Sequence, residues 1–202
     1  MSADQPAPAA PAGIRIRRFT AREWPAYRAL RLRSLADAPM AFGSSLAAEE
    51  AWAHELWMAR LTAAAVSGRD CPLVAESAGS TKSAGSTDAA GSAETNRALL
   101  GLLWAKCDAD DAGVVNLFQM WVAPEARGRG VAGALLDEAL AWARTIDARL
   151  VQLGVVCDNS AAVQLYTRAG FRKVGALAPI RPGSALLEQT MHLDLRAAPE
   201  VQ

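Results

Sequence analysis

The chain has little of what several protein classes depend on. Its 202 residues include three cysteines and two histidines, and 21 Lys and Arg residues are balanced by 21 Asp and Glu residues. The cysteines, Cys71, Cys107 and Cys157, form no CxxC pair, which indicates free thiols in a reducing cytoplasm rather than a disulfide framework. Two dispersed histidines are too few for a typical metal site. We therefore expect neither a disulfide scaffold nor a bound metal.

Two further absences concern charge and apolar length. A formal net charge of zero argues against a general binder of nucleic acid or anionic membranes, because such proteins carry a clear basic excess. No apolar run approaches the roughly 18 residues that cross a bilayer. The opening residues 1–13 have neither the basic nor the apolar region of a signal peptide. We expect a cytoplasmic protein with no nucleic-acid or membrane partner.

The length fits one domain with additional terminal or inserted segments. Hydrophobic residues make up 51% and charged residues 21%, as in soluble globular proteins. Residues 1–13 are rich in Ala and Pro and predict a disordered tail, and residues 196–202 form a second tail. Between them, 14–195 is expected to be a single domain. Residues 77–96 contain the pentapeptide SAGST twice, which indicates a flexible insertion in a hairpin loop.

Hydrophobic periodicity gives the order β-α-α-β-β-β-α-β-α-β-β. The expected strands are 14–19, 71–76, 97–107, 114–122, 150–156, 171–177 and 186–195, and the expected helices are 20–38, 47–65, 129–146 and 161–169. Thr20 with Glu23 three residues later is typical of a capping box at the first helix. The strand–helix–strand crossover in the second half implies one parallel pair. The fold class is therefore α/β in the broad sense (α+β), a central mixed sheet flanked by helices.

One segment carries a chemical signal. The strand 114–122 runs into the turn Arg127-Gly128-Arg129-Gly130, which opens directly into an amphipathic helix. Glycine lets a backbone approach a ligand closely, and a helix N-terminus offers unpaired N–H groups with partial positive charge. Together these features predict a pyrophosphate cradle. The alternative is an ordinary turn with two solvated arginines. No Lys-Ser/Thr pair follows, so the turn is not a P-loop.

The same residues carry a family resemblance. The run Arg127-Gly128-Arg129-Gly130-Val131-Ala132 resembles the R/Q-x-x-G-x-G/A motif of the GCN5-related N-acetyltransferase (GNAT) superfamily. The stretch DNSAAVQLYTRAGF, with Asn159 and Tyr166, is similar to that family's second conserved block. The resemblance covers roughly residues 14–195. It implies the GNAT fold, acetyl-CoA as cosubstrate and no metal.

The resemblance also implies roles for individual residues. The backbone of Met120, Trp121 and Val122 would pair with the pantetheine arm and polarise the thioester carbonyl, and Tyr166 would protonate the departing thiolate. Asn159 either contacts the pantetheine or only caps its helix. The residues of the turn and first helical positions would bind the pyrophosphate: Arg127, Gly128, Arg129, Gly130, Val131 and Ala132.

The acceptor side is less defined. No motif identifies a general base, and four side chains remain candidates: Glu49, Glu50, Glu188 and His192. The acceptor site would be built from the first two helices and the loops 39–46 and 178–185. Side chains that could line it are Trp52, Trp57 and Arg181.

The functional expectation is an N-acetyltransferase, an acyl-CoA-dependent N-acyltransferase. It would move the acetyl group of acetyl-CoA to a primary amine of a small molecule or peptide by direct attack in a ternary complex. Two alternatives stay open: a module that holds acyl-CoA as a sensor without turnover, and a transferase for another acyl group. Pairing of two copies through the last strands is implied by the resemblance alone.

Overall fold

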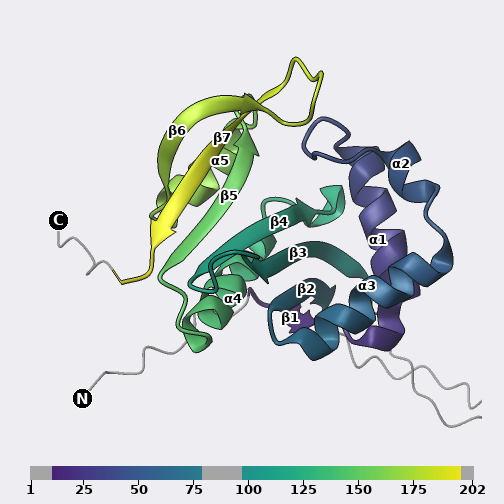
Figure 1. Ribbon diagram of the computed structural model, residues 1–202. Coiled ribbons are helices and arrows are strands. Elements are labelled where there is room, and N and C mark those ends of the chain that lie inside the picture. Colours follow the sequence, from purple (N-terminus) through teal and green to yellow (C-terminus); the bar gives the residue numbers. More distant parts are fainter. Residues whose placement is uncertain (1–10, 79–96, 197–202) are drawn as a thin grey trace, which may run out of the picture.

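The computed structural model describes residues 11–78 and 97–196. The predictions for residues 1–10, 79–96 and 197–202 lie outside the described residues. The described chain contains a seven-stranded mixed sheet with helices on both faces (Figure 1). The predicted fold class and the number and order of the strands are confirmed.

The strands follow the predicted positions closely. They are β1 Ile14–Arg18, β2 Asp70–Ser77, β3 Leu99–Cys107, β4 Val114–Val122, β5 Leu150–Val156, β6 Arg172–Pro179 and β7 Leu187–Asp194. The helices are α1 Trp24–Asp37, α2 Leu46–Glu50, α3 His54–Ser67, α4 Val131–Thr145 and α5 Ser160–Arg168, with short 3₁₀ turns at Ala21–Glu23 and Pro124–Ala126. In the first of these turns, the Thr20 N–H donates to the Glu23 carboxylate at 2.8 Å, which confirms the predicted cap.

The prediction of one helix over 47–65 is wrong, because the chain forms two helices there. The break falls at Ala53, whose backbone is extended with ψ of 152°. It turns Trp52 onto Trp57, with their ring centroids 5.0 Å apart. It also lets Glu49 at the end of α2 pair with Arg31 of α1. Tertiary packing therefore outweighs the helical periodicity of the segment.

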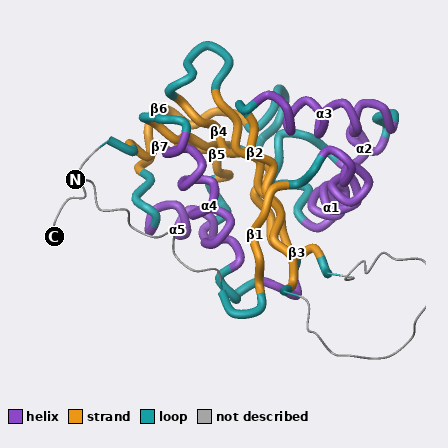
Figure 2. The backbone as a smooth tube through the Cα atoms, turned by 90° about the horizontal axis from the view of Figure 1, so that it is seen from below, coloured by secondary structure: helices purple, strands orange, loops and turns teal. Residues whose placement is uncertain are grey.

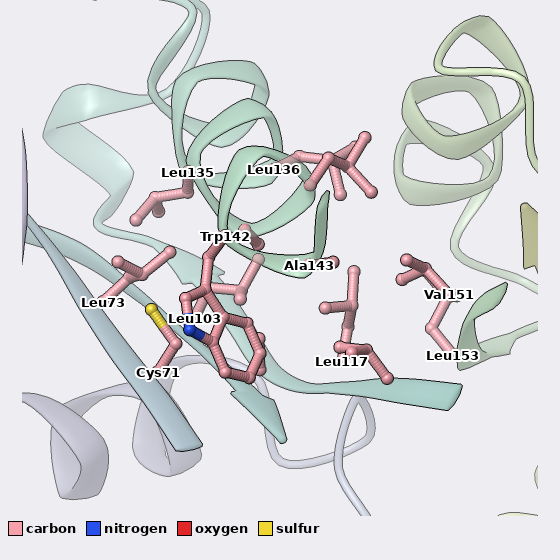
Figure 3. Close-up of a cluster of buried hydrophobic side chains, with 14 of the residues drawn as sticks. Cys71, Leu73, Leu103, Leu117, Leu135, Leu136, Trp142, Ala143, Val151 and Leu153 are labelled. Carbon is pink, nitrogen blue, oxygen red and sulfur yellow. The ribbon is translucent and has the colours of Figure 1, made fainter. Parts of the chain in front are cut away.

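Each face of the sheet has its own apolar core. Helices α4 and α5 cover one face, and α1 and α3 cover the other (Figure 2). The alternation of side chains along β3 supplies both cores, since Leu103 points to the α4 side and Leu102 to the α1 side. Figure 3 shows part of the α4 core, where Leu135 and Trp142 of α4 lie over side chains of the sheet. None of the helices in the described ranges is long and apolar enough to cross a membrane.

The sheet order is β1-β2-β3-β4-β5-β7-β6, and only β4 and β5 pair in parallel. Their register runs from Val114 opposite Leu150 to Leu117 opposite Leu153 and then stops. Beyond that point β4 continues beside β3, while β5 continues beside β7. An irregularity in the β3–β4 register includes Gln119, whose φ is +59°. The two central strands therefore separate in the middle of the sheet.

Candidate functional site

A cleft of about 920 Å³ lies where β4 and β5 separate. Its walls include the second half of β4, the end of β5, the start of α4 and much of α5. Most of the residues predicted to bind ligand line it: Met120, Trp121, Val122, Arg127, Gly128, Gly130, Val131, Ala132, Asn159 and Tyr166. Arg129 is exposed and is not among the described residues that line the cleft.

The N-terminus of α4 opens into this cleft. Gly128 and Gly130 have φ of +70° and +77°, a left-handed conformation that glycine adopts without strain. A Cβ on Gly130 would also lie 3.0 Å from the Pro11 ring. The first N–H that bonds back within the helix is that of Ala134, which donates to the Gly130 carbonyl at 3.0 Å. The N–H groups of Val131, Ala132 and Gly133 therefore have no acceptor within the helix, which suits an anion.

Arg127 is held on the cleft wall by two contacts. Its Nε donates to the Val122 carbonyl at 3.1 Å, and its guanidinium pairs with Asp37 at the end of α1. Asp37 also accepts a hydrogen bond from the Trp121 indole at 2.7 Å. The Trp121 indole and Arg127 together hold the pKa of Asp37 below its ordinary value. The arginine thus joins α1, β4 and the turn.

The second block of the predicted site lies on α5. Tyr166 is 6% exposed and packs against Phe171, and burial raises its pKa. The Asn159 side chain accepts from the Ala162 N–H at 3.1 Å, so the predicted helix cap is confirmed. A contact between Asn159 and a pantetheine stays a prediction, although Asn159 also lines the cleft.

The four candidate bases occupy very different surroundings. Glu49 is 2% exposed and is occupied by Arg31 through hydrogen bonds of 2.7 to 3.2 Å. Glu50 is exposed on α2, and His192 lies on β7 opposite Gln152; neither is among the described residues that line the cleft. Glu188 lines the cleft, and burial raises its pKa.

Two loops meet above the cleft on the α1 side. The loop after α1 approaches the loop between β6 and β7 (Figure 1). The first loop carries Phe42 and the second begins at Ile180, and both residues line the cleft. Arg181 joins the loops by donating to the Phe42 carbonyl at 3.2 Å. Trp52 and Trp57 do not line the described cleft: Trp57 is fully buried against Tyr27 and Trp52. The expectation that Trp57 could line an accessible acceptor site is therefore wrong, because its side chain is fully buried, and the place of the acceptor stays a prediction.

Three cleft residues gave no signal in the sequence analysis: Asp37, Gln119 and Gly154. The side-chain amide oxygen of Gln119 accepts from the Tyr27 hydroxyl at 3.0 Å. The Gln119 backbone has a positive φ of +59°, which a non-glycine residue rarely adopts. A strand pattern does not reveal such a residue. Gly154 lies inside the mainly apolar strand β5, and a glycine inside a strand often marks close approach of another group.

The fold and the cleft define an α/β protein whose site suits an elongated ligand with an anionic end. The chain belongs to the acetyltransferase (GNAT) family, whose profile matches residues 48–171. It is 30% identical over 173 residues to the mycothiol acetyltransferase of Thermobispora bispora, a match that covers 83% of this chain and 50% of that protein. The chain spans half or less of the length of the curated relatives that it matches.

Solved structures share the fold over nearly their whole length. A GCN5-related N-acetyltransferase from Kribbella flavida is 25% identical with a TM-score of 0.66, covering 91% of this chain and 98% of that one. The spermidine N-acetyltransferase of Vibrio cholerae, determined in complex with CoA and spermine, is 18% identical with a TM-score of 0.64, covering 91% and 96%. The second likeness establishes the fold only.

Proposed function

We propose that the protein is an N-acetyltransferase that moves the acetyl group of acetyl-CoA to a primary amine of a small molecule or peptide. The observation that carries the proposal is the separation of β4 from β5 after Leu117 and Leu153, in the same cleft as the open N-terminus of α4. An acyl-CoA needs both features, a strand edge for its amide-bearing arm and a site for its pyrophosphate. The family membership and the acetyltransferase relatives support the same reading.

The β4 edge supplies the partner for the pantetheine arm. The Ala123 N–H donates to the Leu100 carbonyl of β3 at 2.8 Å. Successive residues of a strand face opposite edges, so the polar groups of Val122 face away from β3, toward the opening. The Val122 carbonyl there accepts from Arg127. The backbone from Met120 to Val122 would bind the arm of acetyl-CoA and polarise its thioester carbonyl.

The pyrophosphate would bind at the start of α4. The free N–H groups of Val131, Ala132 and Gly133 offer directed donors, and the helix adds partial positive charge. Because Arg127 is already paired with Asp37, its part in this site is to fix the turn rather than to contribute a free charge. Arg129, within the turn itself, adds an exposed positive charge.

Tyr166 would supply the proton that the departing thiolate needs. Burial raises the pKa of the phenol, so the hydroxyl stays protonated and able to donate at physiological pH. The same burial makes it a weaker acid, but a desolvated thiolate is also a stronger base than a free one. The transfer therefore depends on both groups being in the same dry part of the cleft.

Calorimetric titration with acetyl-CoA tests the proposal. We expect 1:1 binding that is lost in Gly130→Asp, because a carboxylate at the turn repels phosphate. The matched control is Gly68→Asp, which introduces the same residue at a φ of +63°, at the end of α3, with open space around it. The control should bind as the wild type does. Absence of binding to the wild type would refute the assignment, and binding without release of CoA in the presence of any amine would favour an acyl-CoA sensor.

A further inference from the structure

The Glu188 carboxylate lies at the point where the two central strands begin to separate. Leu153 is the last residue of β5 that pairs with β4, and Gly154 is the first beyond the pairing. Glu188 pairs in register with Val156, yet its side chain reaches back over Gly154. A Cβ on Gly154 would lie 2.6 Å from Glu188 Oε2. The glycine therefore leaves the space that the carboxylate occupies.

The Glu188 carboxylate and the Tyr166 ring line the same cleft from opposite faces of the sheet. Leu153 and Val155 point into the core under α4, and Tyr166 of α5 belongs to the same core. Alternation along β5 places Val156 on the other face, and its cross-strand partner Glu188 shares that face. A group bound in the cleft thus has an acid on one face of the sheet and a carboxylate on the other.

Glu188 is the carboxylate of the cleft that is left for a ligand. Among the described residues that line the cleft, the charged side chains are Asp37, Arg127, Arg168 and Glu188. Asp37 is occupied by Arg127 and Trp121. Burial alone raises the pKa of Glu188, and no charged group contributes to the shift. The cross-strand partners of Glu188, Val156 and Ala178, are uncharged. A cation brought to Glu188 would give its carboxylate a charged partner.

Three large apolar side chains line the same cleft as this carboxylate. Phe42, Phe118 and Ile180 line the cleft on the side where the two loops meet. Phe118 follows Leu117 of the α4 core, so it points to the same face as Glu188, and it is 49% exposed. A half-exposed aromatic ring on the same face and in the same cleft as a single carboxylate suits a ligand with one positive charge and an apolar body. A polyamine would leave its further charges without partners.

We infer that Glu188 binds the ammonium group of the acceptor and takes up its proton, and that the acceptor is a monocationic amine with an apolar body. This inference rests on the proposed function and names the substrate class of the same site. The acceptor ammonium gives one proton to the Glu188 carboxylate. The amine nitrogen then bonds to the acetyl carbon while the carbon–sulfur bond breaks.

Two further proton transfers and one release to water complete the reaction. Tyr166 gives its proton to the CoA thiolate, and the second proton of the attacking nitrogen restores the phenol. Glu188 releases its proton to water. The net products are an N-acetyl amide, CoA thiol and one proton. Because only an ionised carboxylate accepts a proton, kcat/KM should rise with pH through the raised pKa of Glu188.

The test compares wild type, Glu188→Gln and the control Glu55→Gln, an exposed residue of α3. The probes are acetyl-CoA, 2-phenylethylamine and spermidine. All three proteins should bind acetyl-CoA equally in calorimetry. Wild type and control should acetylate 2-phenylethylamine in preference to spermidine. Glu188→Gln should lower kcat/KM by about 10² to 10⁴ and abolish the acidic limb of its pH profile. Its affinity for 2-phenylethylamine in the complex with desulfo-CoA should also fall about tenfold or more.

The outcomes separate the two claims. Failure of wild type to bind acetyl-CoA overturns the proposed function and the role of Glu188 with it. Normal acetyl-CoA binding with unchanged turnover and pH profile in Glu188→Gln overturns the role of Glu188 alone. Wild type that acetylates spermidine faster than 2-phenylethylamine, or that acetylates neither, overturns the assignment of a monocationic, apolar acceptor.

Discussion

Asp37 at the end of α1 holds Arg127 of the glycine turn, and the same carboxylate accepts the Trp121 indole N–H at 2.7 Å. Two parts of the chain that are distant in sequence, the end of α1 and the segment from Trp121 to Arg127, thus meet at one carboxyl group beside the cleft. The arrangement fixes the turn before any ligand binds, because the Arg127 guanidinium pairs with Asp37 and also donates to the Val122 carbonyl. Preorganisation of this kind lowers the entropy lost when a ligand binds.

Replacement of Asp37 by Asn should loosen this contact. The Asn carbonyl still accepts from Trp121, but the charge that holds Arg127 is lost. Since Arg127 is half-exposed, we expect a loss of at most about 1 kcal/mol in the free energy of unfolding. The acetyl-CoA affinity should fall more than the stability does, because the turn loses its anchor. Calorimetry and urea denaturation measure the two effects, and an unchanged affinity would contradict the positioning role.

The sign of the pH dependence follows from the lowered pKa of Asp37. A carboxyl group whose pKa is lower in the folded state contributes stability above its unfolded pKa. That contribution is lost as the pH falls through the folded pKa. The stability difference between wild type and Asp37→Asn should therefore be present at pH 7 and shrink at acidic pH. A difference that persists under acidic conditions would exclude the ion pair as its source.

The buried pair of Arg31 and Glu49 gives a larger effect on stability. Both side chains are about 97% buried or more, with exposed fractions of 3% and 2%, and the Arg31 guanidinium also lies 4.6 Å from the centre of the Phe42 ring. Arg31→Met leaves Glu49 buried without a partner and should cost about 3–5 kcal/mol of unfolding free energy. The double variant Arg31→Met/Glu49→Leu removes both charges and should recover most of that loss. Urea denaturation of the three proteins checks the expectation, and a double variant no more stable than the single one would contradict it.

The sequence predicted the parts of the fold that depend on local patterns. Strands 114–122 and 150–156 were predicted with their observed bounds, since mainly apolar runs of this length between turn residues are typical of buried strands. The helix break at Ala53 was missed because its cause is a contact of Trp52 with Trp57 and of Glu49 with Arg31, which no local pattern encodes.

Some residues of the candidate site could be predicted from local sequence patterns, and others could not. The glycine turn and Tyr166 were found because motif spacing carries them, and the structure brings both to one cleft. Asp37 lies far from them in sequence, and only the fold shows that it holds Arg127. Glu188 was one of four equal candidates until the strand register placed it over Gly154. The sequence could propose Glu188 only as one candidate among several, and the long-range contacts of the fold are what favour it.

Removal of the Tyr166 hydroxyl tests its proposed role as proton donor. Tyr166→Phe keeps the packing of the ring against Phe171, so stability should change little. The value of kcat should fall by about 10² to 10⁴, the usual range for loss of an acid catalyst, while the acetyl-CoA affinity stays the same. Steady-state kinetics with 2-phenylethylamine and calorimetry with acetyl-CoA provide the measurements. Unchanged kcat would remove the hydroxyl from the mechanism and leave Tyr166 as a packing residue.

Gly154→Ala probes the position of the Glu188 carboxylate without touching its charge. The new Cβ would meet Glu188 Oε2 at 2.6 Å, so the flexible end of that side chain must move. The backbone of Gly154 is not left-handed, and alanine therefore adds no strain of its own. If the carboxylate must lie at the apex of the strand opening, kcat/KM for the amine should fall at least about tenfold, with acetyl-CoA binding retained. The acidic limb of the pH profile should persist, since Glu188 still titrates, whereas Glu188→Gln should lose it. Full activity in Gly154→Ala would show that the carboxylate acts from another place, and the space left by the glycine would then have only a packing role.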